Sequence, residues 1–217
     1  MKKTLLQLCA LGLVLAAASG ARAQELGTRG NLVFSAERLF GFYVDKQTVD
    51  PDVGPSFSVS STDFSLLWNA PPTPMTIPRL GVDYFIDEHW TIGGNLGVFS
   101  LSQDRNPGTA DATGILFGVR GGYALRLSHG VSFWPRAGFT YTTVNASGGV
   151  GGIGSVGTDR NMFALALEGM FTLAPSESWA FLVGPTIDLG LAGSIAGQDA
   201  TEYAFGIMCG VSGWLNL

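Results

Sequence analysis

The chain has 217 residues, of which 46% are hydrophobic and only 13% charged, with a mean hydropathy of +0.28 and a formal net charge of -5. This acidic balance excludes a typical nucleic-acid-binding protein, because the neutralisation of phosphates requires a basic surface. After the first 23 residues, no segment has the roughly 18 uninterrupted apolar residues of a membrane helix, so any lipid-facing surface must be built from strands.

The first 23 residues have the three parts of a secretory signal peptide. Lys2 and Lys3 form a basic segment, Leu5–Ala18 is apolar, and Ala21-Arg22-Ala23 is a small-x-small cleavage site. The apolar run is too short for a transmembrane anchor. We therefore predict that residues 1–23 are removed and that the mature protein begins at Gln24.

The predicted mature chain, residues 24–217, forms a single domain. Processing would remove three basic residues and no acidic ones, leaving nine basic against 17 acidic residues and a net charge of -8. Cys9 would leave with the signal peptide. Cys209 would then be the one remaining cysteine, which excludes an intramolecular disulfide framework.

Period-two alternation of apolar and small or polar residues recurs along the mature chain, which is typical of strands with one face in lipid. Glu37-Arg38 breaks the alternation in the first of these segments and indicates a β-bulge. Eight predicted strands have this pattern: Asn31–Tyr43, Arg79–Ile86, Trp90–Leu101, Ile115–Leu127, Val131–Thr142, Phe163–Leu173, Trp179–Leu191 and Tyr203–Leu217.

The connections between these strands alternate in length. Three are short turns, at Asp87–His89, Ser128–Gly130 and Ala174–Ser178, and four are long links, at Val44–Pro78, Ser102–Ala112, Asn145–Arg160 and Ala192–Thr201. The pattern predicts an all-β fold, an eight-stranded antiparallel transmembrane up-and-down β-barrel with short periplasmic turns and longer outer loops. A ninth membrane strand at Phe57–Trp68 would break this parity, so we assign that segment to the first outer loop.

Four tryptophans, Trp90, Trp134, Trp179 and Trp214, lie near a short turn or the C-terminus. Tryptophans gathered at one end of a barrel are expected to form an interfacial aromatic girdle. The alternative, that they are core residues of a soluble β-sandwich, gives no reason for this gathering.

The glycines Gly152, Gly154 and Gly157 have the spacing G-x-G-x-x-G of a dinucleotide-binding turn. Glu177 follows at about the distance of the acidic residue that binds the ribose. However, that turn requires a helix after it, whereas the residues from Phe163 onward alternate as a strand. We interpret Gly148–Gly157 as the tip of an outer loop.

Seven charged residues have the non-lipid parity of their strands: Asp83, Arg120, Arg126, Arg136, Glu168, Asp188 and Glu202. The interior of an eight-stranded barrel is just wide enough for side chains to fill. Charges in such a space should pair, since an unpaired buried charge costs several kcal/mol. We predict a lumen charge network, no wide pore, and an ion pair between Arg136 and Glu168, which lie at similar depth on adjacent strands.

Residues for catalysis or metal binding are sparse. The two histidines, His89 and His129, fall in the predicted periplasmic turns and have no spaced partner ligands. Asp50 and Asp52 are best explained as solvated loop residues. We therefore assign no catalytic, cofactor-binding or metal-binding residue.

The leader, the segment Pro78–Ser100 and the last strand Glu202–Leu217 resemble those of small outer-membrane β-barrels of the outer membrane protein X and W type. The resemblance implies location in the outer membrane of a Gram-negative bacterium, contact with outer-membrane lipid, and assembly by the barrel-assembly machinery. Members commonly end in an aromatic residue that this machinery recognises. This chain ends in Leu217, with Trp214 nearby.

We expect a non-enzymatic and monomeric integral outer-membrane protein with a structural or adhesive role, or with narrow porin-like passage of small solutes. Two alternatives stay open at this point. A lipid-A-modifying barrel enzyme is disfavoured by the positions of the histidines. A soluble exported β-barrel that binds a small ligand is disfavoured by the apolar outward faces of the strands.

Overall fold

The computed structural model describes residues 26–67, 77–105, 108–150, 153–176 and 178–217. The predicted signal peptide, residues 1–23, and the predicted start at Gln24 lie outside these residues, as does Trp68. Within them, the chain forms strands and turns, and no helix there is long and apolar enough to cross a membrane.

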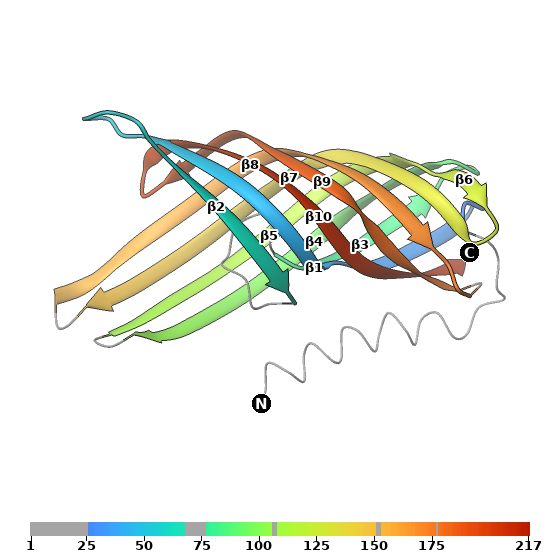
Figure 1. The fold of residues 1–217 in the computed structure, drawn as a ribbon, viewed down its shortest axis with the longest axis horizontal. Coiled ribbons are helices and arrows are strands. Elements are labelled where there is room, and N and C mark those ends of the chain that lie inside the picture. Colours follow the sequence, from blue (N-terminus) through green and yellow to red (C-terminus); the bar gives the residue numbers. More distant parts are fainter. Residues whose placement is uncertain (1–25, 68–76, 106–107, 151–152, 177) are drawn as a thin grey trace.

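The described residues form one antiparallel sheet that closes on itself through pairing of the first and last strands (Figure 1). The strands are β1 (Asn31–Asp50), β2 (Phe57–Leu66), β3 (Arg79–Phe85), β4 (Trp90–Arg105), β5 (Gly108–Tyr123), β6 (Leu125–Ser128), β7 (Val131–Val150), β8 (Ile153–Leu173), β9 (Trp179–Ile195) and β10 (Gln198–Asn216). Both β2 and β3 pair with β1, and both β5 and β6 pair with β7. The ten strands therefore occupy eight positions in the barrel wall, as the alternation predicted.

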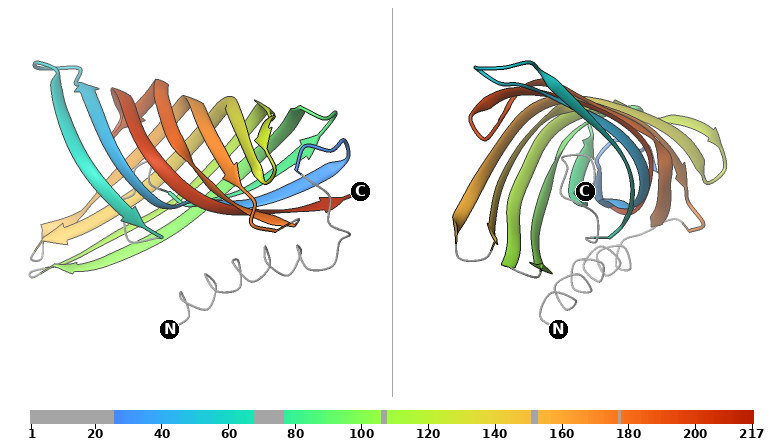
Figure 2. Two further views of the ribbon diagram at one scale, coloured as in Figure 1. Left: turned by 45° about the vertical axis from the view of Figure 1, so that its right-hand side comes forward. Right: turned by 60° about the vertical axis from the view of Figure 1, so that its left-hand side comes forward.

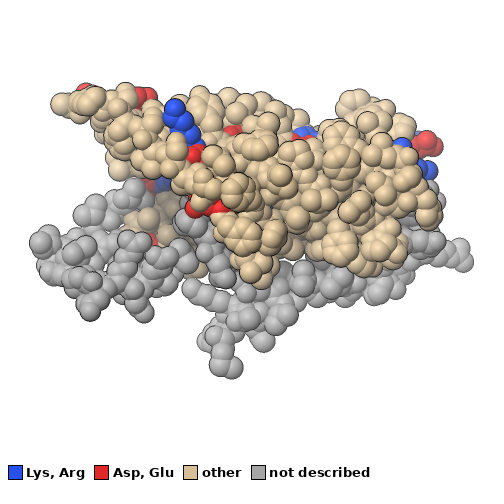
Figure 3. Space-filling view, in the orientation of Figure 1, with Lys and Arg blue, Asp and Glu red and all other residues tan. Residues whose placement is uncertain are grey.

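The outer surface of the wall carries large apolar side chains because alternate residues of each strand point away from the lumen. On β8 these apolar residues extend from Phe163 to Leu173, a span that fits the roughly 9–11 residues of a tilted transmembrane strand. Beyond Phe163 the outward residues become polar, as do those beyond Val44 on β1. Few charged side chains interrupt the broad face in Figure 3. We call this belt the apolar band.

The two ends of the barrel differ. At one end, hereafter the short-turn end, lie the connections β3–β4, β6–β7 and β8–β9 together with Leu217. At the other, the long-hairpin end, lie the connections β1–β2, β4–β5, β7–β8 and β9–β10 (Figure 1).

The predicted long loops are wrong in one respect, because the strands continue through most of them. β7 runs to Val150 and β8 begins at Ile153, and these two residues pair. Outside the apolar band the outward residues are no longer apolar, so the sequence pattern that predicts a strand ends there. Backbone pairing does not depend on apolar side chains, and the strands continue. The described residues of the glycine-rich segment Gly148–Gly157 thus lie in β7 and β8, and β8 continues as a strand to Leu173, which excludes the helix that a dinucleotide-binding turn needs.

The assignment of Phe57–Trp68 to a loop is also wrong. Its described part, Phe57–Leu66, is β2, which pairs with β1 from Phe40 to Val49. β3 pairs with the preceding part of β1, from Leu32 to Glu37. Because β2 and β3 share one wall position, the parity of eight is kept although β2 is a strand.

This arrangement makes the wall different in its two halves (Figure 2). In the half at the short-turn end, β1, β3 and β4 pair in sequence and the ring of hydrogen bonds is complete. In the other half, within the described residues, β2 pairs only with β1, and β4 beyond Leu96 pairs only with β5. The backbone ladder is therefore interrupted between β2 and β4.

The predicted bulge at Glu37-Arg38 is confirmed. The register between β1 and β10 shifts between Ala36 and Phe40, and Arg38 has a φ of 55°, in the left-handed region. The extra residues place the side chains of both Glu37 and Arg38 inside the barrel, where both are fully buried.

Candidate functional site

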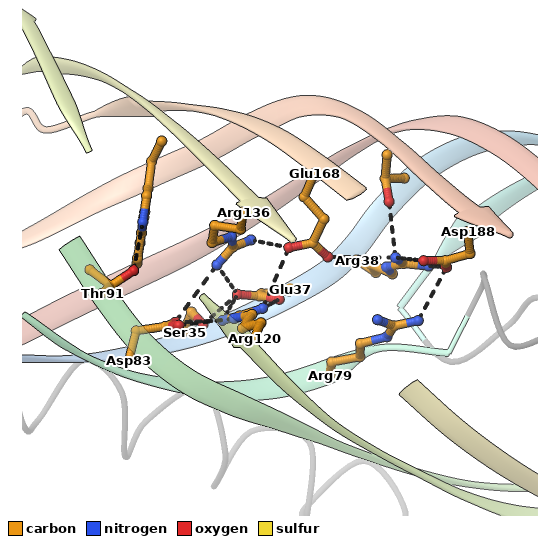
Figure 4. A network of polar contacts seen from close by, with 12 residues as sticks. Ser35, Glu37, Arg38, Arg79, Asp83, Thr91, Arg120, Arg136, Glu168 and Asp188 are labelled. Atoms are coloured by element: carbon orange, nitrogen blue, oxygen red, sulfur yellow. Dashed lines mark hydrogen bonds and ion pairs between the residues drawn. The ribbon is translucent and has the colours of Figure 1, made fainter. Parts of the chain in front are cut away.

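The lumen at the middle depth of the apolar band is filled by charged side chains (Figure 4). Four arginines and four carboxylates from six strands meet there, and none is more than 7% exposed. This lumen network consists of Glu37, Arg38, Arg79, Asp83, Arg120, Arg136, Glu168 and Asp188. Its formal charges cancel.

Arg120 of β5 is the centre of one half of the network. Its Nε and Nη2 donate to the two carboxylate oxygens of Asp83 at 2.9 and 2.5 Å. Its Nη1 and Nη2 donate to the two oxygens of Glu37, both at 2.7 Å. Glu37 also accepts a hydrogen bond of 2.7 Å from the hydroxyl of Ser35. Two bidentate pairs on one guanidinium fix the side chain in a single geometry.

The predicted ion pair between Arg136 and Glu168 is present. The two residues are direct partners in the β7–β8 register, and Nη2 of Arg136 lies 2.8 Å from Oε2 of Glu168. Nη1 of Arg136 donates to Oε1 of Glu37 at 2.7 Å. The guanidinium also lies over the ring of Trp134, 4.8 Å from its centroid, in a cation–π contact.

Asp188 of β9 is the centre of the other half. It accepts hydrogen bonds from Nη1 of Arg38 at 2.7 Å and from Nη2 of Arg79 at 3.3 Å. Arg38 donates in addition to the hydroxyl of Thr186 at 2.9 Å. Glu168 connects the halves, because its oxygens lie 3.5 Å from Nη2 of Arg38 and 3.5 Å from Nη1 of Arg120.

The network leaves little room in the lumen at this depth. A cavity beside Arg120, Arg136 and Glu168 has a volume of about 10 Å³, the space of about one water molecule. On the side of the short-turn end, buried apolar side chains including Phe85, Trp134 and Met170 fill the interior. The described side chains thus fill much of the lumen at mid-depth.

Five of the seven predicted lumen residues, Asp83, Arg120, Arg136, Glu168 and Asp188, lie in the lumen network. Glu202 is also buried, but it pairs with Arg160 nearer the long-hairpin end. The sequence interpretation missed Glu37, Arg38, Arg79 and Arg160. Arg79 lies four residues before Asp83 on β3 and therefore points to the same face, so counting along the strand could have identified it as a lumen residue. Glu37 likewise shares the inward parity of Val33 and Tyr43. Arg38 has the opposite parity and points inward only because of the bulge, and Arg160 was assigned to a loop.

Arg126 requires a correction, because its side chain is exposed. The even residues of β5 point inward, as the buried Arg120 and Gly122 do, but Arg126 lies in β6 at the short-turn end. It lines a cavity at that end instead of joining the network. Parity predicts the face of a residue and not whether the barrel still encloses it at that depth.

Two of the four predicted girdle tryptophans also require correction. Trp134 is fully buried, and its Nε1 donates to the hydroxyl of Thr91 at 3.2 Å, while Trp214 is 3% exposed. On β7 and on β10 the even-numbered residues point into the barrel, and Trp134 and Trp214 are among them. Trp90, 54% exposed, and Trp179, half-buried, lie at the short-turn end and contact Tyr123 and Phe181 respectively.

Both histidines, His89 and His129, lie at the short-turn end. Asp50 and Asp52 are exposed at the tip of the β1–β2 hairpin. Across the described part of the chain, no three His, Cys, Asp or Glu side chains are placed to hold a metal ion.

A second polar group lies in the lumen nearer the long-hairpin end. Ser61 of β2 contacts the carboxylates of both Asp45 and Asp63, and Arg160 pairs with Glu202. Asp45 is 7% exposed and Glu202 4%. The enclosed space on this side of the network is therefore acidic.

Comparison with known proteins identifies the fold. No protein-family model and no curated protein matches the sequence. Among solved structures, the outer membrane protein OprG of Pseudomonas aeruginosa is similar over 89% of this chain and 100% of its own, with 12% identity and a TM-score of 0.51. Neisserial surface protein A is similar over 85% of this chain and 96% of its own (13% identity, TM-score 0.47). The strand pairing and the likeness to OprG show that the chain has the fold of the small eight-stranded outer-membrane barrels.

Proposed function

We propose that this protein is a non-enzymatic integral protein of the outer membrane that presents its long hairpins outside the cell. The apolar band supports membrane insertion, because its height matches a bilayer. β7 and β8 have 20 and 21 residues, whereas a tilted strand needs roughly ten to cross the membrane. About half of each strand would therefore stand beyond the bilayer.

The lumen network is the observation that carries the proposed role. A channel needs a continuous path for water, and here four guanidinium groups and four carboxylates from opposite sides of the barrel bond one another at mid-depth. Opening such a path would separate buried charges, which costs several kcal/mol for each unpaired group. This favours a structural or adhesive role over the passage of small solutes.

Single-channel conductance in planar bilayers tests this role. We expect no stepwise conductance from the wild-type protein. The double variant Glu37→Ala/Arg120→Ala removes two large side chains from the network while keeping its charges balanced, and we expect it to give resolvable steps. Stable steps in the wild-type protein would contradict a closed lumen and restore the small-solute channel.

The assignment as a non-enzyme is supported by the position of the histidines. Both lie at the short-turn end, which we assign to the periplasm, so neither would reach a lipid in the outer leaflet. Mass spectrometry of lipid A from a strain that lacks the gene should give the same species as the parent strain. A lipid A species that disappears with the gene and returns on complementation would show instead that the barrel is a lipid-modifying enzyme.

A further inference from the structure

A group of polar side chains lies on the outside of the barrel wall, directly beyond the apolar band. Four neighbouring strands, β5, β7, β8 and β9, contribute to it, and its side chains are half-buried or exposed. Each of them has a direct partner among the others in the strand registers, so they lie side by side on one face of the sheet. We call this group the polar face, and it consists of Thr113, Thr143, Asn145, Asp159, Asn161 and Ser194.

The polar face continues the surface that the apolar band presents to lipid. Two residues along β5 from the exposed Ile115, the outward side chain is Thr113, and two residues along β8 from the exposed Phe163 it is Asn161. Residues two apart on a strand point to the same side. In a bilayer that covers the apolar band, the polar face therefore meets the headgroups of the lipids whose chains contact the band.

Tyr141 of β7 joins the band to the polar face. Its ring centroid lies 5.5 Å from that of the exposed Phe117, and its hydroxyl donates to Oδ1 of Asn161 at 3.3 Å. Because an amide group is planar, this bond turns the two Nδ2 donors of Asn161 away from Tyr141. A sugar has hydroxyl groups that donate and accept and a ring with apolar C–H surfaces. Amide groups beside an aromatic ring offer a contact for both parts.

The charge of the polar face favours an uncharged ligand over a phosphate. Phosphate groups are bound by arginine and lysine, and neither residue belongs to the polar face. Its one charged member is Asp159, and its other members are hydroxyl and amide side chains that both donate and accept. Arg160, the residue between Asp159 and Asn161 on β8, instead pairs with the buried Glu202 in the lumen.

We propose that the polar face binds an uncharged sugar in the headgroup of a glycolipid. Asn145 and Asn161 would bond the hydroxyl groups of the sugar, Tyr141 would contact its ring, and the lipid chains would lie on the apolar band. That this glycolipid belongs to the outer leaflet rests on the function and orientation proposed above. The preference for a sugar over a phosphate does not.

The test uses the full protein in phosphatidylcholine nanodiscs and follows the side-chain amide ¹⁵N–¹H signals of Asn145 and Asn161 by NMR. The probe is glucosyl diacylglycerol added to the bilayer, with phosphatidic acid of the same chains and free glucose as comparison probes. Asn161→Ala is read at Asn145, and Asn145→Ala is read at Asn161. Ser60→Ala is the matched control, because Ser60 is exposed on β2, which β1 and β10 separate from the polar face.

The glycolipid should shift both amide signals in a saturable way, at mole fractions at which phosphatidic acid does not. Each asparagine variant should need about tenfold more glycolipid for half-saturation while keeping the folded spectrum. Ser60→Ala should behave as the wild type does.

Equal shifts from phosphatidic acid, equal shifts from free glucose, equal weakening by Ser60→Ala, or no saturable shift would each overturn the proposal. These outcomes are independent of conductance and of the orientation in cells. Absence of the shifts in a protein that has inserted into nanodiscs would therefore contradict the sugar site alone, whereas failure to insert would contradict the membrane location as well.

Discussion

At the scale of single residues, the buried charges of the lumen depend on one another. Arg120 bonds Asp83 and Glu37 at the same time, and Glu168 is shared by three arginines. Loss of one partner leaves the opposite charge buried and poorly compensated. Loss of an oppositely charged pair keeps the balance and should cost less.

The pair Arg136–Glu168 permits a direct test of this dependence. Each single variant, Arg136→Met or Glu168→Met, should lower the free energy of unfolding by about 3 kcal/mol, because it leaves a net charge in the buried network. The double variant should lose clearly less than the sum of the two. Urea unfolding from lipid vesicles measures all four proteins. Simple additivity of the single losses would show that the two residues are not coupled.

Trp134 and Trp90 offer a second test at this scale. Trp134 is fully buried beside Arg136, whereas Trp90 is 54% exposed on the outside of the barrel. In variants that keep one of these tryptophans and no other, brominated phospholipids should quench the fluorescence of Trp90 strongly and that of Trp134 weakly. Equal quenching would place Trp134 at the lipid surface, as the girdle interpretation did.

At the scale of elements, alternation in the sequence predicts the part of each strand that faces lipid. The outward residues Phe163 to Leu173 on β8 show this, since each apolar residue alternates with a buried one. Beyond Phe163 the outward residues Asn161 and Asp159 are polar, so the apolar alternation ends there although the strand continues. β2 was assigned to a loop for a different reason, because a ninth membrane strand would break the parity of eight. The sequence does not show that β2 and β3 share one position in the wall.

The same limit explains which site residues could be predicted. Arg136 and Glu168 lie on regular strands, where parity and depth follow from counting, and their pairing was predicted correctly. Glu37 has the inward parity of Val33 and Tyr43 and could have been placed by counting, whereas the bulge also turns Arg38, which has the opposite parity, into the lumen. Arg126 was wrongly assigned to the lumen. It has the inward parity, but it lies at the short-turn end, where its side chain is exposed.

The bulge on β1 requires a glycine on the facing strand. A Cβ added at Gly210 of β10 would lie 2.5 Å from the carbonyl oxygen of Ala36 and 3.1 Å from Cα of Glu37. Backbone atoms cannot move aside easily, so Gly210→Ala should lower the free energy of unfolding by about 1–3 kcal/mol. Gly121→Ala is the control, because its nearest contact would be 3.6 Å away. Equal stability of the two variants in urea would contradict the close approach at the bulge.

At the scale of the whole molecule, the barrel combines a half with a complete ring of strand pairing and a half in which β2 and β4 do not pair within the described residues. The lumen network lies between these halves and joins six strands of the wall. The long hairpins continue on the side of the interrupted half (Figure 2). This difference between the two ends is the basis of the cell-surface role proposed above.

The central claim is that the barrel sits in the outer membrane with its long hairpins outside, and cysteine labelling on intact cells tests it most directly. In a Cys209→Ser background, Val53→Cys lies at the tip of the β1–β2 hairpin, where Val53 is 91% exposed, and Glu88→Cys lies in the exposed β3–β4 turn. A membrane-impermeant maleimide should label position 53 on whole cells and position 88 only after lysis. Labelling of position 88 but not position 53 on whole cells, or of neither on whole cells and both after lysis, would contradict the account.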